Sequence, residues 1–157
     1  MKHGHLLGFL LCVIVLTGVL HSPAMAAIET AQDYYFSNFT INASSYKVLN
    51  EAAAKGNTTP MYLYITSASH QSIIVMALGC GVNVPSVNNT TNCTCDGDGY
   101  QTSYVTCNRY IDYSVHSSVW EDGYPFASFG FTNNLNAQKS ITGEWSADTI
   151  YSHVDAY

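Results

Sequence analysis

Hydrophobic residues form one long run near the start of the chain and then shorter runs separated by polar turns. The long run covers residues 6–20, and the small residues Ala24 and Ala26 follow it. A basic start, an apolar run of this length and small residues two positions apart are typical of a cleavable secretory signal. The run is shorter than the roughly 20 residues that span a bilayer. We therefore predict a signal peptide over residues 1–26 and a single secreted domain over residues 27–157.

The pattern after the leader predicts one short helix and then β-structure. Residues 46–55 contain good helix formers, a serine can cap their start, and Gly56 can end them. After residue 60 the apolar runs are aromatic and β-branched, which favours strands, beginning with residues 61–66. Residues 71–80 include a run that is apolar on both faces, typical of a strand in the middle of a sheet.

Turn residues divide the rest of the chain into further strands. Residues 95–99 read Cys-Asp-Gly-Asp-Gly, and Asp-Gly pairs favour tight hairpin turns. We expect a long strand over residues 100–115 and shorter aromatic strands within 124–131 and 141–151. The expected fold is therefore mainly β, either a small antiparallel barrel or a β-sandwich, with one short N-terminal helix.

Charge excludes two classes of partner. Five Lys and Arg stand against eleven Asp and Glu, a net charge of −6, and loss of Lys2 with the leader makes it −7. Scattered acidic residues argue against nucleic acid and anionic membranes as partners. No later apolar run is long enough to span a membrane. We expect no nucleic-acid partner and no membrane span in the mature chain.

Acceptor triplets for N-linked glycans cluster in the first half of the mature chain. The pattern Asn-X-Ser/Thr, with X not proline, occurs six times within 55 residues and indicates a eukaryotic or viral secretory route. Each modified asparagine must face solvent. The expected sites are Asn38, Asn42, Asn57, Asn88, Asn89 and Asn92.

Four cysteines remain once the leader is removed, and an even number in a short secreted chain indicates two disulfides. Cys93 and Cys95 are too close in sequence to bond to each other without strain. Two pairings stay open, Cys80–Cys93 with Cys95–Cys107 or Cys80–Cys95 with Cys93–Cys107. The spacing does not fit a four-thiolate zinc site, and we expect no metal and no other cofactor.

No motif typical of an enzyme stands out. The nucleophile elbow Gly-x-Ser-x-Gly, the zinc-protease helix motif and the phosphate-binding glycine loop do not occur in the sequence. The mature chain has only His70, His116 and His153, so a hydrolase would need one of them beside a serine and a carboxylate. We expect no enzymatic activity.

Aromatic residues offer the best candidate for a binding site. The chain has 12 Tyr, and this side chain combines a large apolar ring with a polar tip. Trp120, Glu121 and Asp122 place two carboxylates beside an aromatic ring, which can hold a cation. With Tyr110 they form the ligand-binding site expected here. The alternative is an exposed turn flanked by core aromatics.

One stretch resembles the opening of tick salivary lipocalins. Residues 45–50 read Ser-Tyr-Lys-Val-Leu-Asn, residues 61–64 read Met-Tyr-Leu-Tyr, and Cys80 ends the following strand. These match an aromatic-Lys-x-Leu-Asn helix, a tyrosine-rich first strand and a cysteine at the end of the next strand. The resemblance covers residues 44–80. It implies an eight-stranded barrel that sequesters a biogenic amine or a lipid mediator among acidic and aromatic side chains.

Two functions are consistent with these observations. The first is a secreted, non-enzymatic glycoprotein that binds a small apolar or cationic molecule. The alternative is a secreted β-sandwich that binds a host or cell-surface protein through a tyrosine-rich face. An enclosed pocket lined by Tyr and Trp would favour the first function, and a filled core with exposed aromatic side chains would favour the second.

Overall fold

The computed structural model describes residues 32–149, 151 and 153–157. The expected signal peptide lies outside these residues. The described part of the chain forms strands and turns and contains no helix, so it holds no helix long and apolar enough to cross a membrane. The prediction of a mainly β protein is confirmed.

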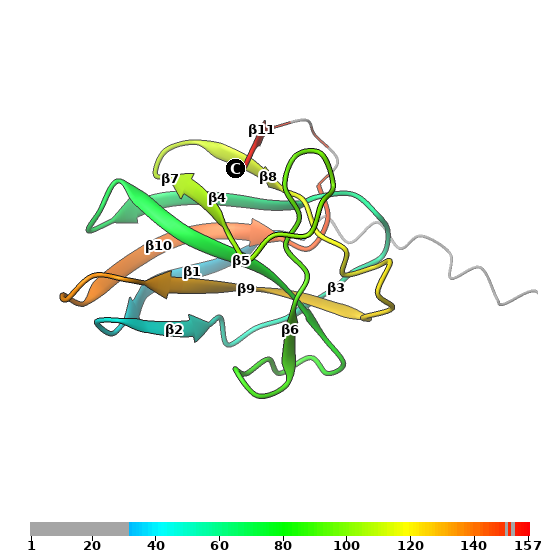
Figure 1. The fold of residues 1–157 in the computed structure, drawn as a ribbon, viewed down its shortest axis with the longest axis horizontal. Coiled ribbons are helices and arrows are strands. Elements are labelled where there is room, and N and C mark those ends of the chain that lie inside the picture. Colours follow the sequence, from blue (N-terminus) through cyan, green and yellow to red (C-terminus); the bar gives the residue numbers. More distant parts are fainter. Residues whose placement is uncertain (1–31, 150, 152) are drawn as a thin grey trace, which may run out of the picture.

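Two curled sheets hold the strands and form a half-barrel (Figure 1). All pairings are antiparallel except the short parallel pairing of the last strand. Across the first sheet the order is β1 (Tyr34–Ile41), β10 (Lys139–Ser146), β4 (Met61–Ala68), β8 (Asp112–Val115) and β11 (Val154–Asp155). Across the second sheet the order is β2 (Ser45–Val48), β9 (Phe126–Asn133), β5 (Ser72–Cys80) and β6 (Thr90–Asn92), with β3 (Ala53–Ala54) on β9 and β7 (Val105–Asn108) on β5.

The two sheets share one packed core. Alternate residues of each strand face it, as the two-residue period of a strand requires. Its largest side chains are almost completely buried, and they are Trp145, Tyr113, Phe129 and Phe131. Trp145 meets Phe129 edge to face, with ring centroids 5.7 Å apart. Aromatic side chains therefore fill the centre of the half-barrel.

Neighbouring strands in the sheets are mostly not consecutive in the chain. In the first sheet β10 lies between β1 and β4, and in the second β9 lies between β2 and β5. An up-and-down barrel of the lipocalin type pairs consecutive strands. The strand order of this chain therefore differs from that of the eight-stranded barrel implied by the lipocalin resemblance.

The helix expected over residues 46–55 is not formed, and that prediction is wrong. The segment instead lies along β9, through β2 and then β3. Between these strands the N–H of Leu49 donates to the carbonyl oxygen of Phe129 at 2.9 Å. This pairing buries Val48, Leu49 and Ala53 in or beside the core. Burial against a neighbouring sheet outweighs a helix preference of a few tenths of a kcal/mol per residue.

The strand expected over residues 100–115 is divided into two. β7 pairs with β5 in the second sheet, whereas β8 pairs with β4 in the first. Tyr110 lies between them with a φ of 65°, a left-handed backbone that turns the chain from one sheet to the other. The expected strands over 61–66 and 71–80 are confirmed as β4 and β5. The turn over residues 95–99 is also confirmed, and Gly99 there has a φ of 85°.

The disulfide prediction is wrong, because all four cysteines are free and buried. Cys107 pairs with Ile73 of β5, and the N–H of Cys93 donates to the carbonyl oxygen of Ala77. At about 3.3 Å per residue along β5, Cys93 lies roughly 10 Å from Cys80 and roughly 13 Å from Cys107. A disulfide needs Cα atoms about 4.4–6.8 Å apart. Each of the two expected pairings contains one of these distant pairs.

Candidate functional site

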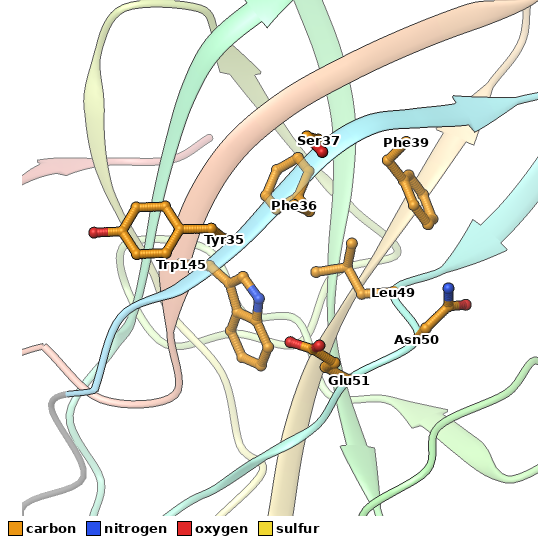
Figure 2. A pocket seen from close by; sticks show the side chains of 8 residues that line it. All are labelled: Tyr35, Phe36, Ser37, Phe39, Leu49, Asn50, Glu51 and Trp145. Carbon is orange, nitrogen blue, oxygen red and sulfur yellow. The ribbon is translucent and has the colours of Figure 1, made fainter.

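A hollow with an apolar floor lies at the seam between the two sheets. There β1 ends the first sheet, and residues 49–51 run along the border of the second between β2 and β3. The cleft between them has a volume of about 180 Å³ (Figure 2). We call it the seam cleft, lined by Tyr35, Phe36, Ser37, Phe39, Leu49, Asn50, Glu51 and Trp145.

The floor of the seam cleft is apolar and belongs to the core. Phe36, Phe39, Leu49 and Trp145 are each at least nine-tenths buried. The ring of Phe36 lies 6.4 Å from that of Phe39 and 5.6 Å from that of Phe131, measured between centroids. Such packing holds the floor in one arrangement before any ligand arrives.

A β-bulge brings both phenylalanines of β1 to the floor. In a regular strand, residues three positions apart point to opposite faces. The pairing of β1 with β10 shifts between Phe36 and Phe39, and Asn38 between them has a φ of 49°. The N–H of Asn38 donates to Oγ1 of Thr142 at 3.1 Å, which holds the bulge on β10. The extra residue turns Phe39 to the same side as Phe36.

The rim of the seam cleft is polar and exposed. Tyr35 has 72% of its surface exposed, and Ser37, Asn50 and Glu51 are exposed as well. The carbonyl oxygen of Glu51 accepts a hydrogen bond from Oγ of Ser128 at 2.7 Å, so the backbone of this wall is held in place. Figure 2 shows the Glu51 carboxylate extending toward the indole of Trp145. The cleft therefore combines an apolar floor with a negative charge at its edge.

A second hollow, of about 250 Å³, lies near the C-terminal residues of the chain. We call it the tyrosine–histidine hollow, lined by Asp33, Tyr62, Ser146, Asp148, Thr149, Tyr151 and His153. His153 lies against the ring of Tyr62 at 4.9 Å and that of Tyr151 at 6.4 Å, measured between centroids. Aromatic rings beside carboxylates are suited to a cation.

Tyr62 is the polar centre of the tyrosine–histidine hollow. Its hydroxyl lies 2.8 Å from Oδ1 of Asp112 and 3.1 Å from Oε1 of Glu144, and donates to one of them at a time. Burial, and then the two carboxylates, raise the pKa of Tyr62, so the phenol stays protonated at neutral pH. A protonated phenol leaves the negative charge on the carboxylates.

The binding site expected from the sequence is divided between two places. Trp120, Glu121 and Asp122 lie in a turn after β8, where the N–H of Asp122 donates to the carbonyl oxygen of Ser118 at 2.8 Å. Both carboxylates are exposed, which fits the alternative of an exposed turn. Tyr110 precedes β8, is 61% exposed and has the Arg109 guanidinium over its ring at 5.4 Å. It therefore lies at the other end of β8 from the turn.

The three histidines that follow residue 26 in the chain occupy three different surroundings. Nε2 of His116 lies 2.9 Å from Oδ1 of Asp155, and Nδ1 of His70 lies 3.2 Å from Oγ of Ser69. The third, His153, packs on Tyr62. Within the described part of the chain, these contacts do not join a serine, a histidine and a carboxylate in series. No group of three His, Cys, Asp or Glu side chains suited to a metal occurs among the described residues either.

The candidate glycosylation sites differ in how far the fold engages their side chains. Oδ1 of Asn57 accepts hydrogen bonds from N and Oγ1 of Thr59, and Oδ1 of Asn92 accepts them from N and Oγ1 of Thr94. Both amides are thus engaged within their own triplets. The other four sites, Asn38, Asn42, Asn88 and Asn89, are exposed residues. The Asn89 amide is nevertheless engaged as well, because its Nδ2 donates to the carbonyl oxygen of Val84 at 3.0 Å and its Oδ1 accepts from the N–H of Ser86 at 2.7 Å.

Sequence reasoning did not find the seam cleft. Its residues come from β1, β10 and residues 49–51, which are far apart in the chain. One local signal exists in the spacing of Phe36 and Phe39, because two buried residues three apart in a strand require a bulge. Nothing in the sequence indicates which segment forms the opposite wall.

The fold and its clefts define a β-rich protein with a filled core and half-open hollows on its surface. Residues 22–149 match a family described as a protein of unknown function (DUF2712), and the chain belongs to this family. Comparison with curated proteins and with solved structures gives no match.

Proposed function

We propose that this chain is a secreted, non-enzymatic binding protein that holds a segment of a partner protein in the seam cleft. The observation that carries the proposal is a filled core next to a rigid apolar floor that opens to solvent. Trp145, Phe129 and Phe131 occupy the space that a barrel would offer to a ligand. A lipid mediator in particular needs an interior volume that these side chains fill. We therefore place the bound partner on the surface of the protein and not in its interior.

The chemistry of the seam cleft specifies the partner segment. One apolar side chain of the partner covers Phe36, Leu49 and the edge of Trp145, and the burial of that apolar area supplies affinity. A basic side chain next to it pairs with Glu51 at the rim. The net charge of −6 also favours a positively charged partner at longer range. The preferred segment is therefore an apolar residue beside Lys or Arg.

Exposed tyrosines support a protein partner. At the rim of the cleft, Tyr35 has 72% of its surface exposed. A rigid ring with a polar tip is common at binding surfaces. Further tyrosines that are more than half exposed are Tyr100, Tyr104, Tyr110, Tyr151 and Tyr157.

A peptide library displayed on phage and panned against residues 27–157 tests this proposal. The selected peptides are expected to contain an apolar residue next to a basic one. Tyr35→Ala is expected to weaken their binding about tenfold, the effect of losing roughly 1.4 kcal/mol. Tyr110→Ala, which removes an exposed tyrosine elsewhere, is the matched control and leaves affinity unchanged. Selection of no such peptides, or equal binding by Tyr35→Ala, would overturn the proposal.

A small cation is the second candidate ligand, and the tyrosine–histidine hollow favours it. Tyr62, Tyr151 and His153 supply aromatic rings, and Asp112 and Glu144 supply negative charge next to Tyr62. Titration calorimetry with a panel of biogenic amines tests this function. Saturable heat that Glu144→Gln abolishes supports it, and absence of heat at millimolar amine rejects it.

Secretion is part of the proposal and rests on the pattern of residues 1–26. Expression of the full chain in a secreting host, followed by N-terminal sequencing of the protein in the medium, tests it. The mature protein is expected to begin at Ala27. Retention of the uncleaved chain in the cells would contradict secretion.

A further inference from the structure

Lys55 and Asp148 form a buried pair of opposite charge at one end of the half-barrel. Lys55 follows β3 on the second sheet, and Asp148 follows β10 on the first. Each residue is only 2% exposed, and Nζ of Lys55 contacts Oδ1 of Asp148 directly. Lysine and aspartate are rarely buried so deeply, because each charge loses its hydration. The deep burial of both charged side chains therefore calls for a physical explanation.

The surroundings hold the Asp148 carboxyl group in one orientation. Oδ2 accepts a hydrogen bond from the N–H of Gly56 at 3.1 Å, and Oδ1 accepts one from Oγ1 of Thr59 at 3.3 Å. Nζ of Lys55 also donates to the carbonyl oxygen of Thr59 at 2.5 Å. An amine is thus fixed against one carboxyl oxygen, while a backbone donor binds the other.

Burial also favours the reactive form of the amine. Desolvation lowers the pKa of Lys55, although Asp148 and Glu121 oppose the shift by favouring the charged form. A neutral amine is a nucleophile, and a carboxyl group beside it is an acyl acceptor. Holding two such groups in contact makes their reaction effectively unimolecular.

We propose that Lys55 and Asp148 join through an intramolecular amide bond after the chain folds. The lone pair of Nζ attacks Cγ of Asp148, and the Nζ–Cγ bond forms as the Cγ–Oδ1 bond breaks. Oδ1 leaves as water and takes its protons from the amine and the carboxyl group. Oδ2 becomes the amide oxygen and keeps the Gly56 N–H as its donor. One amine and one carboxylic acid give one amide and one water, so no oxidant, metal or co-reactant is needed.

Such a bond would tie the two sheets together. It would join the end of β3 to the end of β10, in a chain whose four buried cysteines are all free. A covalent link between residues far apart in sequence restricts the unfolded chain, as a disulfide does. A secreted protein without disulfides gains stability by this route in either redox environment.

The intact mass of residues 27–157, produced in bacterial cytoplasm so that no N-glycan is added and measured under denaturing conditions, tests the proposal. We expect a mass one water molecule below the value calculated from the sequence, and one tryptic species in which the peptides containing Lys55 and Asp148 are joined. Lys55→Arg and Asp148→Ala are expected to show their full calculated masses. A wild-type protein at full calculated mass, with the two peptides separate, would overturn the proposal even if both variants failed to fold.

Asp148→Asn gives an independent check, because an amide side chain reacts with loss of ammonia instead of water. The joined product of this variant has the same covalent structure as the joined wild type. It is therefore expected to have the same final mass, although the two calculated sequence masses differ. If the wild type has lost one water but its final mass and that of the variant still differ by the calculated difference, another pair of groups has reacted.

Discussion

At the scale of single residues, burial controls the chemistry of the cysteines. Cys80, Cys93 and Cys107 are fully buried, and Cys95 nearly so. Loss of hydration raises the pKa of the thiols of Cys80 and Cys93 to about 11. A thiol reacts as its thiolate, so in the folded protein these groups are inert near neutral pH. They serve here as small apolar side chains of the core.

The same burial predicts how stability depends on alkaline pH. A thiol whose pKa is higher in the folded than in the unfolded state is stabilising below the unfolded value of about 9. This contribution is lost as the pH rises through about 11, because the unfolded chain releases protons that the folded chain keeps. Urea unfolding is therefore expected to show a falling free energy of unfolding between pH 9 and 11. Cys80→Ala should make this fall shallower, and an identical fall in the variant would contradict the assignment to this thiol.

At the scale of strands, β1 and β4 can approach β10 closely because residue 143 is a glycine and has no side chain. Gly143 of β10 lies between Phe36 of β1 and Ile65 of β4. A Cβ atom placed on Gly143 would lie 2.3 Å from the carbonyl oxygen of Tyr64 and 2.8 Å from Cζ of Phe36. The ring of Phe36 thus covers the glycine and at the same time forms the floor of the seam cleft. Strand packing and the cleft rest on the same contact.

Gly143→Ala is accordingly expected to destabilise the fold. The added methyl group meets a backbone oxygen that cannot move without disturbing β4, and overpacking of this kind costs about 1–3 kcal/mol. Gly81→Ala is the matched control, because a Cβ there meets nothing within 4 Å. Urea unfolding of both variants measures the difference. Equal stability of the two variants would show that β10 shifts to accept the methyl group.

Strands could be predicted from the sequence where the local pattern of apolar residues reflects which positions are buried. The aromatic and β-branched residues of β4 correctly predicted a strand, and the run of β5 that is apolar on both faces correctly predicted a strand in the middle of a sheet. The segment around Leu49 has helix-forming residues, but pairing with β9 determines its structure. The break at Tyr110 and the bulge at Asn38 also depend on partners distant in sequence. For the same reason the seam cleft could not be predicted.

At the scale of the whole molecule, the two sheets are held by one aromatic core and by the Lys55–Asp148 contact. The core joins Phe36 of β1 to Phe131 of β9, and Trp145 of β10 to Phe129 of β9. Both contacts cross from the first sheet to the second. Separating the sheets would expose these rings, and burial of each large apolar side chain is worth about 1.5–3 kcal/mol.

The absence of disulfides between the free cysteines predicts that reducing agents leave this stability unchanged. Removing two disulfides from a small secreted domain would be expected to cost on the order of 2–5 kcal/mol each and to lower the melting temperature clearly. Here Cys93 is level with Ala77 on β5, too far from Cys80 or Cys107 to be linked to either. Calorimetry of the mature protein with and without dithiothreitol is expected to give one melting temperature. A lower value in the reductant would mean that the thiols pair in the mature protein, with a shift in the register of β6 or β7 against β5.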